Sequence, residues 1–361
     1  TFKFLDQYIG AVTECFRSKR IHIGMDEAWD MGRGRFLTKN GYVPPFEIFN
    51  EYMERLIAIT NKYGLTPMMW SDMYFRNNSK TEYYYDTEAR IPESTKKKIP
   101  KNVQLVFWHY GECWACDDEM IRLHRELGRD VIYAGATWGW AGHFADHVFA
   151  RETVRISLDA CRKWGVREMM NTYWTKGDTT PSAQLLALSD AAEMCYRESP
   201  DEEHFKSRFE CVSGADYDVF AAASLYHNSE DVLEKTLVNE VGDTGVHTRR
   251  FMGVQLFWQD ILSGMYDASL YEHPMSAHYR MAAERGSGYK NEKWQYFYDF
   301  VYNVFSYLSL KCEIAERIAP SYKSNDRAAL AEIKDTLLPR LIELTERVHQ
   351  CHRVAWFNEC R

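Results

Sequence analysis

Five short apolar runs, each followed by acidic or aromatic residues, constrain the fold of this chain more than any other feature. They cover residues 21–25, 66–70, 103–108, 131–135 and 167–173. Most of the segments between them carry helical patterns, and glycines at 64, 128 and 165 stand where such helices would end. Strands that alternate with helices form parallel sheets whose strands are covered by the helices. The sequence therefore predicts an α/β fold.

The residues that follow the runs favour a barrel over a doubly wound sheet. They are Asp26 and Glu27, then Trp70 to Asp72, Trp108 to Tyr110, Trp138 to Trp140, and Trp174. Barrel enzymes build their sites at the carboxyl ends of several strands, whereas a dinucleotide-binding sheet would show a glycine-rich turn after its first strand. We therefore predict a (β/α)8 TIM barrel of which this chain holds five units. A helical pattern precedes the first run, so we expect the natural protein to extend further at its N-terminus by roughly 100 residues.

The second half of the chain has a different character, because strand patterns disappear near residue 198. We predict that residues 1–197 form the C-terminal part of a TIM-barrel catalytic domain and that residues 198–361 form an α-helical C-terminal domain. Residues 293–318 and 326–351 have helical patterns, and the first of these is rich in aromatic residues. One helix cannot bury so many aromatic side chains, so we expect a homodimer through the helical region.

Composition excludes several classes of function. The formal net charge of −8 argues against a nucleic-acid or membrane-surface partner, and no apolar run reaches the roughly 18 residues of a transmembrane helix. Nine cysteines without regular spacing indicate reduced thiols and a cytoplasmic location. The aromatic content of 15% favours a carbohydrate ligand, because sugars bind on flat apolar faces beside polar groups.

Asp26 and Glu27 are the strongest candidates for catalysis. Two adjacent carboxylates after a strand tend to raise the pKa of one of them, and a protonated carboxyl group can act as a general acid. The alternative is that an acidic pair simply begins a loop.

Residues 22–27, His-Ile-Gly-Met-Asp-Glu, resemble the His-x-Gly-Gly-Asp-Glu signature of glycoside hydrolase family 20, the β-N-acetylhexosaminidases. The similarity continues through further motifs at residues 26–35, 69–73, 106–110, 134–140 and 256–264. The last two resemble the bacterial cytoplasmic branch of the family, which carries a helical C-terminal domain. In the family the acidic pair closes the fourth barrel strand, so the resemblance implies that this chain holds strands four to eight.

The resemblance also implies an activity, the exo-acting release of N-acetylglucosamine or N-acetylgalactosamine from β-linked glycans, with retention and without a metal or cofactor. Glu27 would be the general acid and base, Asp26 would hold the acetamido group of the substrate as it attacks, and Tyr110 would donate to the acetamido oxygen. The implied substrate-binding residues are Trp70, Asp72, Trp108, Trp138, Trp140, Trp174 and Asp178.

The chain departs from the family pattern at three places. Trp108 is followed by His109, Tyr110 and Gly111, where the closer relatives carry an acidic residue and a second aromatic residue. Met25 stands where most relatives have glycine, and no glutamate follows Asp178, which leaves the preference between the two amino sugars open. Two other functions remain as alternatives. One is a non-catalytic sugar-binding protein or inactive fragment, and the other is a metal-dependent hydrolase using His22, Asp26 and His109. A separate pair, His143 and His147, has helical spacing for a metal but no evident third ligand.

Overall fold

The computed structural model describes residues 1–111, 113–227, 252–272 and 274–360. It divides into two compact units, residues 1–135 with 153–171 and residues 136–152 with 172–361. The sequence boundary between residues 197 and 198 remains a prediction.

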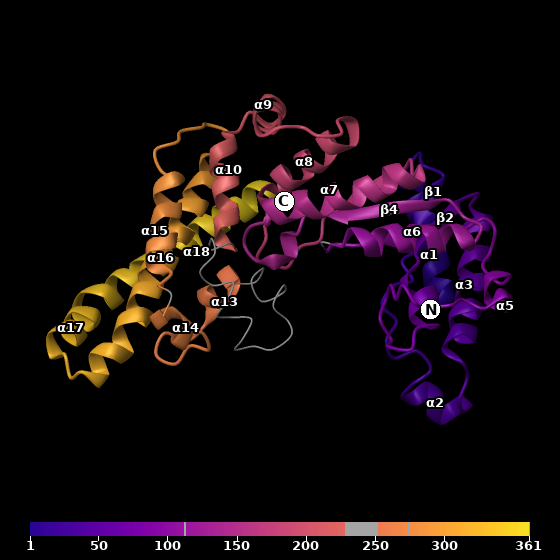
Figure 1. Ribbon diagram of the computed structural model, residues 1–361, viewed down its shortest axis with the longest axis horizontal. Coiled ribbons are helices and arrows are strands. Elements are labelled where there is room, and N and C mark those ends of the chain that lie inside the picture. Colours follow the sequence, from indigo (N-terminus) through magenta and orange to yellow (C-terminus); the bar gives the residue numbers. More distant parts are fainter. Residues whose placement is uncertain (112, 228–251, 273, 361) are drawn as a thin grey trace. The chain divides into compact units, whose positions relative to one another are not determined.

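The first unit is built on a parallel sheet of five strands in sequential order (Figure 1). The strands are β1 (Arg20–His22), β2 (Thr66–Trp70), β3 (Gln104–Trp108), β4 (Val131–Ala136) and β5 (Met169–Thr172). The register places Ile21 beside Pro67, Met69 beside Leu105, and Val106 beside Ile132. All five predicted strands are present, and the expected parallel arrangement is confirmed.

One side chain shows how strongly this sheet curls. Arg20 at the start of β1 donates to Glu168, just before β5, at 2.6 Å and to Gln104 at 2.8 Å. A flat sheet would hold its first and fifth strands about 19 Å apart, too far for one arginine to bridge. The sheet is therefore a curled half-barrel, which confirms the predicted barrel fold with five of its eight strands.

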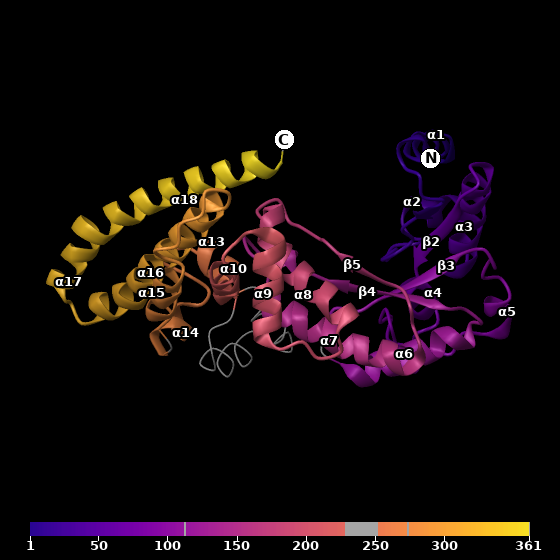
Figure 2. The ribbon, with the colours of Figure 1, turned by 90° about the horizontal axis from the view of Figure 1, so that it is seen from above.

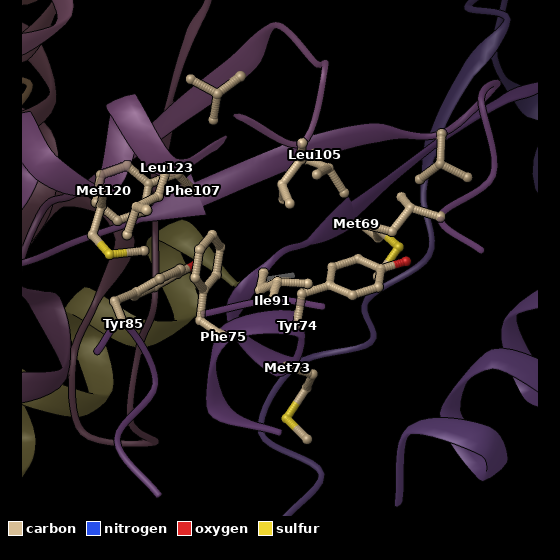
Figure 3. Packing of buried hydrophobic residues seen from close by; sticks show 14 of the residues in the cluster. Met69, Met73, Tyr74, Phe75, Tyr85, Ile91, Leu105, Phe107, Met120 and Leu123 are labelled. Carbon is tan, nitrogen blue, oxygen red and sulfur yellow. The ribbon is translucent and has the colours of Figure 1, made fainter. Parts of the chain in front are cut away.

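Side chains alternate between the two faces of the strands. The outer face of β2 and β3 carries Met69, Leu105 and Phe107, which pack with α3 and α6 side chains in a large buried cluster (Figure 3). The inner face carries Trp70, Val106, Ile132 and Ala134 in a smaller cluster, against which Trp108 packs. Because side chains alternate in this way, the outer-face residues form the core and the inner-face residues are directed toward the proposed site.

The helices of the first unit follow the chain between the strands. They are α1 (Phe2–Cys15), α2 (Arg35–Asn40), α3 (Pro45–Lys62), α4 (Asp72–Arg76), α5 (Glu93–Lys96), α6 (Trp114–Glu126) and α7 (His147–Trp164), the last of which is shared with the second unit. The predicted glycine stops act as expected, because Gly64, Gly128 and Gly165 follow α3, α6 and α7 with φ of 65°, 70° and 63°.

The described residues of the second unit are mainly helical, which confirms the predicted helical C-terminal region (Figure 2). After the short 3-10 helices η1 (Gly139–Ala141) and η2 (Pro181–Gln184) come α8 (Leu185–Tyr196), α9 (Glu202–Ser213), α10 (Tyr217–Ala223), η3 (Ser224–Tyr226), α13 (Met252–Trp258), α14 (Asp267–Glu272), α15 (Ser276–Arg285), α16 (Gln295–Lys323), α17 (Arg327–Glu332) and α18 (Leu338–Glu359). The aromatic helix α16 packs against both α15 and α18.

The helix predicted over residues 326–351 differs in one detail. It is divided by a π-helical turn, η4 (Ile333–Leu337), between α17 and α18. Pro339, in the first turn of α18, has no N–H to donate into the preceding turn, which accounts for the irregular hydrogen bonding at this point.

The cysteines are not all reduced as expected. Cys113 and Cys116 form a disulfide at the start of α6, whereas the other seven cysteines are free. The expectation of free thiols is therefore wrong for this pair. None of the described helices combines the length and apolar character required to cross a membrane.

Candidate active site

The turn after β1 carries the acidic pair in a strained backbone. The strand ends at His22 because Gly24 and Met25 adopt φ of 76° and 81°, and Glu27 follows at 49°. The Gly24 carbonyl still accepts from the Trp70 N–H at 3.0 Å, so the turn stays fastened to the end of β2. Positive φ is costly for residues with a Cβ, and such strain persists mainly where the surroundings impose it. In this turn the side chains of both Asp26 and Glu27 are exposed to solvent.

Asp72 ties this turn to the next strand. Its Oδ2 accepts a hydrogen bond from the Glu27 N–H at 3.0 Å, and its side chain is fully buried. Burial, together with the nearby charge of Asp26 and against the opposing hydrogen bond from Glu27, raises the pKa of Asp72 to about 7. The Trp108 side chain also hydrogen-bonds to the Asp72 carboxyl group, which opposes this rise. Asp72 therefore fixes the backbone of Glu27 and joins it to the side chain of Trp108 at the end of β3.

A buried polar network supports Asp72 from behind. The neighbouring Ser71 donates to the Val106 carbonyl at 3.0 Å, and its hydroxyl lies 2.7 Å from His124 Nε2 and 3.2 Å from the Tyr85 hydroxyl. Burial lowers the pKa of His124 to about 4, so this imidazole is neutral at physiological pH. These bonds join the end of β2 to β3 and α6, and they hold the carboxyl ends of the strands together.

Tyr84 is a site residue that the sequence interpretation missed. Its hydroxyl hydrogen-bonds to the Glu27 carboxyl group, and burial together with the Glu27 charge raises the pKa of this tyrosine above its usual value. Its ring lies 5.3 Å from that of Trp108 and 5.0 Å from that of Trp29. The one sequence signal that could have indicated it is the run of three tyrosines at residues 83–85, in a segment without helical or strand pattern.

Aromatic rings from β2 and β3 line the inner face beside the turn. Trp70 is buried and its ring lies 4.4 Å from the His22 ring. Trp108 and Tyr110 are half-buried and their rings lie 5.2 Å apart, as expected for residues on one face of an extended chain. The structure thus brings together Asp26, Glu27, Trp70, Asp72, Trp108 and Tyr110 at the carboxyl ends of β1 to β3.

The two histidines of the metal-dependent alternative have other partners. His22 Nδ1 accepts from the Gly24 N–H at 3.1 Å, and burial lowers the pKa of His22 to about 4. His109 Nδ1 lies 2.7 Å from the buried Asp117 Oδ1, and the His109 ring stacks on Phe107 of the outer face. Within the described residues, no group of three or more histidine, cysteine, aspartate or glutamate side chains is placed to hold a metal ion.

The remaining predicted site residues belong to the second unit. Trp138 is buried at φ 58°, with its ring 4.5 Å from Trp140 and 4.7 Å from Phe149, so it serves the packing of this unit. Trp174 is 46% exposed. The Asp178 carbonyl accepts from His352 at 3.1 Å, and its Oδ1 is buried with no partner in the described part of the chain. Roles for these residues in sugar binding remain predictions.

His143 and His147 each form a hydrogen bond with a hydroxyl group. His143 Nδ1 lies 2.8 Å from the Tyr226 hydroxyl, and His147 Nδ1 is hydrogen-bonded to Ser224. Burial lowers the pKa of His143 to about 3 and that of His147 to about 4. Both are neutral histidines that connect α7 and the turn before it to η3.

Comparison with known proteins gives two family matches along the chain. Residues 1–146 match the Glycosyl hydrolase family 20, catalytic domain, and residues 235–361 match the Glycoside Hydrolase 20C C-terminal domain. No curated protein sequence matches the chain. The first match contains the acidic turn and the first four strands, and the second contains helices α13 to α18. The predicted resemblance is confirmed, and the chain belongs to glycoside hydrolase family 20, whose members hydrolyse hexosaminides.

Proposed function

We propose that this protein is an exo-acting β-N-acetylhexosaminidase that releases terminal N-acetylglucosamine or N-acetylgalactosamine by a retaining, substrate-assisted mechanism. The observation that carries the proposal is the placement of Glu27. Its backbone N–H is held by Asp72 and its carboxyl group by Tyr84, beside the exposed carboxyl group of Asp26. A positioned acid next to a second carboxylate is the arrangement that glycoside hydrolysis uses.

Glu27 would transfer protons in both halves of the reaction. In the first, the acetamido oxygen of the substrate attacks C1, the glycosidic C–O bond breaks, and the Glu27 proton passes to the leaving oxygen. In the second, the Glu27 carboxylate takes a proton from the water that attacks C1, which opens the oxazolinium ring and regenerates the acetamide. General acid–base catalysis of this kind contributes roughly 10²–10⁴-fold to the rate.

Asp26 would stabilise the intermediate rather than transfer a proton to the leaving group. Its carboxylate would accept from the acetamido N–H and oppose the positive charge that develops on the ring, while Tyr110 donates to the acetamido oxygen. Trp70 and Trp108, which belong to one apolar cluster on the inner face, would form the walls around the acetamide. Because such walls exclude water, they strengthen the interactions between charges inside the site.

The test compares two substrates and two variants of the full-length protein. The substrates are an aryl β-N-acetylglucosaminide and the matched aryl β-glucoside, which lacks the acetamide. Wild type should hydrolyse the first and leave the second nearly untouched, because the enzyme supplies no nucleophile of its own. Comparable hydrolysis of both sugars would refute the substrate-assisted mechanism.

The variants separate the two carboxylates. Glu27→Gln should lose most activity on substrates with poor leaving groups and recover part of it on aryl substrates, which need little protonation. Asp26→Asn should lose activity with every leaving group, because the charge opposite the oxazolinium is gone. A wild type that binds N-acetylglucosamine without turning over any of these substrates would support the sugar-binding alternative. The cytoplasmic location and the natural glycan remain part of the proposal.

A further inference from the structure

Trp29 is an exposed tryptophan on the same turn as the proposed acid. Its backbone N–H donates to the Glu27 carbonyl at 2.9 Å, and 51% of its surface is accessible. Tyr84 forms a second connection between Trp29 and Glu27. Its ring contacts the Trp29 ring edge-on, and its hydroxyl hydrogen-bonds to the Glu27 carboxyl group. The position of this indole is therefore coupled to the position of the proton donor.

An arginine holds the indole in place. The Arg76 guanidinium lies over the Trp29 ring, 5.0 Å from its centroid, and the Arg76 side chain is only 10% exposed. Its Nη2 bonds to Glu82 at 3.1 Å, whereas its Nε is buried without a hydrogen-bond partner among the described residues. Burying a guanidinium carries a desolvation cost. Single exposed apolar residues are common, but this one is held by a cation that is itself largely removed from solvent.

The surroundings of the ring are polar and carry charges of both signs. Arg33 lies between Asp30 at 3.7 Å and Glu82 at 3.9 Å, and all three side chains are well exposed. Two arginines thus face two carboxylates around the indole, with the exposed Tyr83 beside Tyr84. A flat apolar surface with a rim of hydrogen-bonding groups suits a neutral pyranose better than an apolar group, and the exposed carboxyl groups of Asp26 and Glu27 on the same turn disfavour an anionic sugar.

We propose that Trp29 is the platform for the sugar on the leaving-group side of the scissile bond. This inference rests on the proposed function, because the general acid protonates the oxygen that departs with that sugar. A residue fastened to Glu27 by its backbone and through Tyr84 is placed to contact the leaving group. The proposal commits to a neutral hexopyranose stacked on the indole, with its hydroxyl groups bonded by the Asp30, Arg33 and Glu82 rim.

The test measures leaving-group preference in the full-length protein. The substrates are methyl β-N-acetylglucosaminide, whose leaving group has no ring, and disaccharides in which N-acetylglucosamine is β-linked to glucose or to N-acetylglucosamine. The quantity compared is the ratio of kcat/KM for disaccharide to kcat/KM for methyl glycoside. Trp29→Ala should lower this ratio roughly tenfold, a change equivalent to about 1.4 kcal/mol, and Trp29→Phe should restore part of it.

The matched control is Trp114→Ala. Trp114 is 44% exposed and has the Lys163 ammonium 5.0 Å over its ring, so it loses a similar surface and a similar cation contact. The control should leave the ratio unchanged. An unchanged ratio in Trp29→Ala, with wild-type activity present on both substrates, would overturn the platform alone. A wild type that cleaves neither substrate would overturn the proposed function and the platform with it.

Discussion

The free energy of unfolding should depend on pH through Asp72, and Asp72→Asn should remove that dependence. Asp72 is fully buried, one of its oxygens accepts the Glu27 N–H, and its carboxyl group is also hydrogen-bonded to the Trp108 side chain. Asparagine has the same shape, keeps an oxygen acceptor for the Glu27 N–H, and carries no charge. The substitution therefore tests the cost of the charge separately from the loss of packing.

The sign follows from the two protonation states. Burial raises the pKa of Asp72 from its ordinary 3.8 to about 7. Between these values the folded protein keeps a proton that the unfolded chain has lost, so the free energy of unfolding falls as pH rises through this window. One pKa unit corresponds to about 1.4 kcal/mol, which makes the cost about 4 kcal/mol at pH 8. Between pH 5 and pH 8 the change is about 2.5 kcal/mol.

The assay is urea unfolding followed by tryptophan fluorescence, with wild type and Asp72→Asn each measured at pH 5 and pH 8. The variant should gain about 2.5 kcal/mol relative to wild type between the two pH values. Asp190, whose pKa burial also raises to about 7, titrates in the same range but is present in both proteins and cancels. A wild-type-to-variant difference that is equal at pH 5 and pH 8 would refute the claim that Asp72 is buried at a cost.

Three further substitutions test the geometry. Met25→Gly should be more stable than Met25→Ala by about 1 kcal/mol in thermal unfolding, because glycine tolerates the φ of 81° there; the opposite order would contradict this backbone. Tyr84→Phe should lower kcat more for methyl than for aryl glycosides, since it removes the hydroxyl bonded to Glu27, and an equal loss on both would argue for a packing role. Gly139→Ala should destabilise by about 1–3 kcal/mol, because a Cβ there would lie 2.0 Å from Gln184; a change within 0.5 kcal/mol would contradict that contact.

The strands could be predicted from the sequence because their signals are local. Residues 66–70 and 131–135 are apolar, short and bounded by polar residues, and the observed strands match them closely. The first strand is shorter than its apolar run, since the backbone turns at Gly24 and Met25. Nothing in the identity of Met25 signals a positive φ, because methionine seldom adopts one. The family resemblance, with glycine at this position in most relatives, was the available indication.

The acidic pair could be predicted from the sequence, but its surroundings could not. Asp26 and Glu27 follow an apolar run directly, whereas Tyr84 reaches Glu27 from a long loop between β2 and β3. Contacts across more than 50 residues depend on the path of such a loop, which has no periodic pattern. The same limit explains Asp72: its position after a strand was visible, but its burial and its raised pKa depend on how β1 and β2 meet.

The features around Glu27 that lower the free energy of unfolding lie in one small part of the fold. Met25 and Glu27 adopt positive φ, Asp72 is a buried carboxyl group, and the Arg76 guanidinium is largely removed from solvent over the Trp29 ring. Each feature is of a kind that opposes folding by about 1–4 kcal/mol. A chain selected for stability alone would place glycine at 25, a neutral residue at 72 and an apolar residue at 76. Local choices that conflict with stability usually mark functional positions. The residues at positions 25, 72 and 76 together hold Glu27 beside a carboxylate and an aromatic surface. Proton transfer to a departing sugar requires this arrangement.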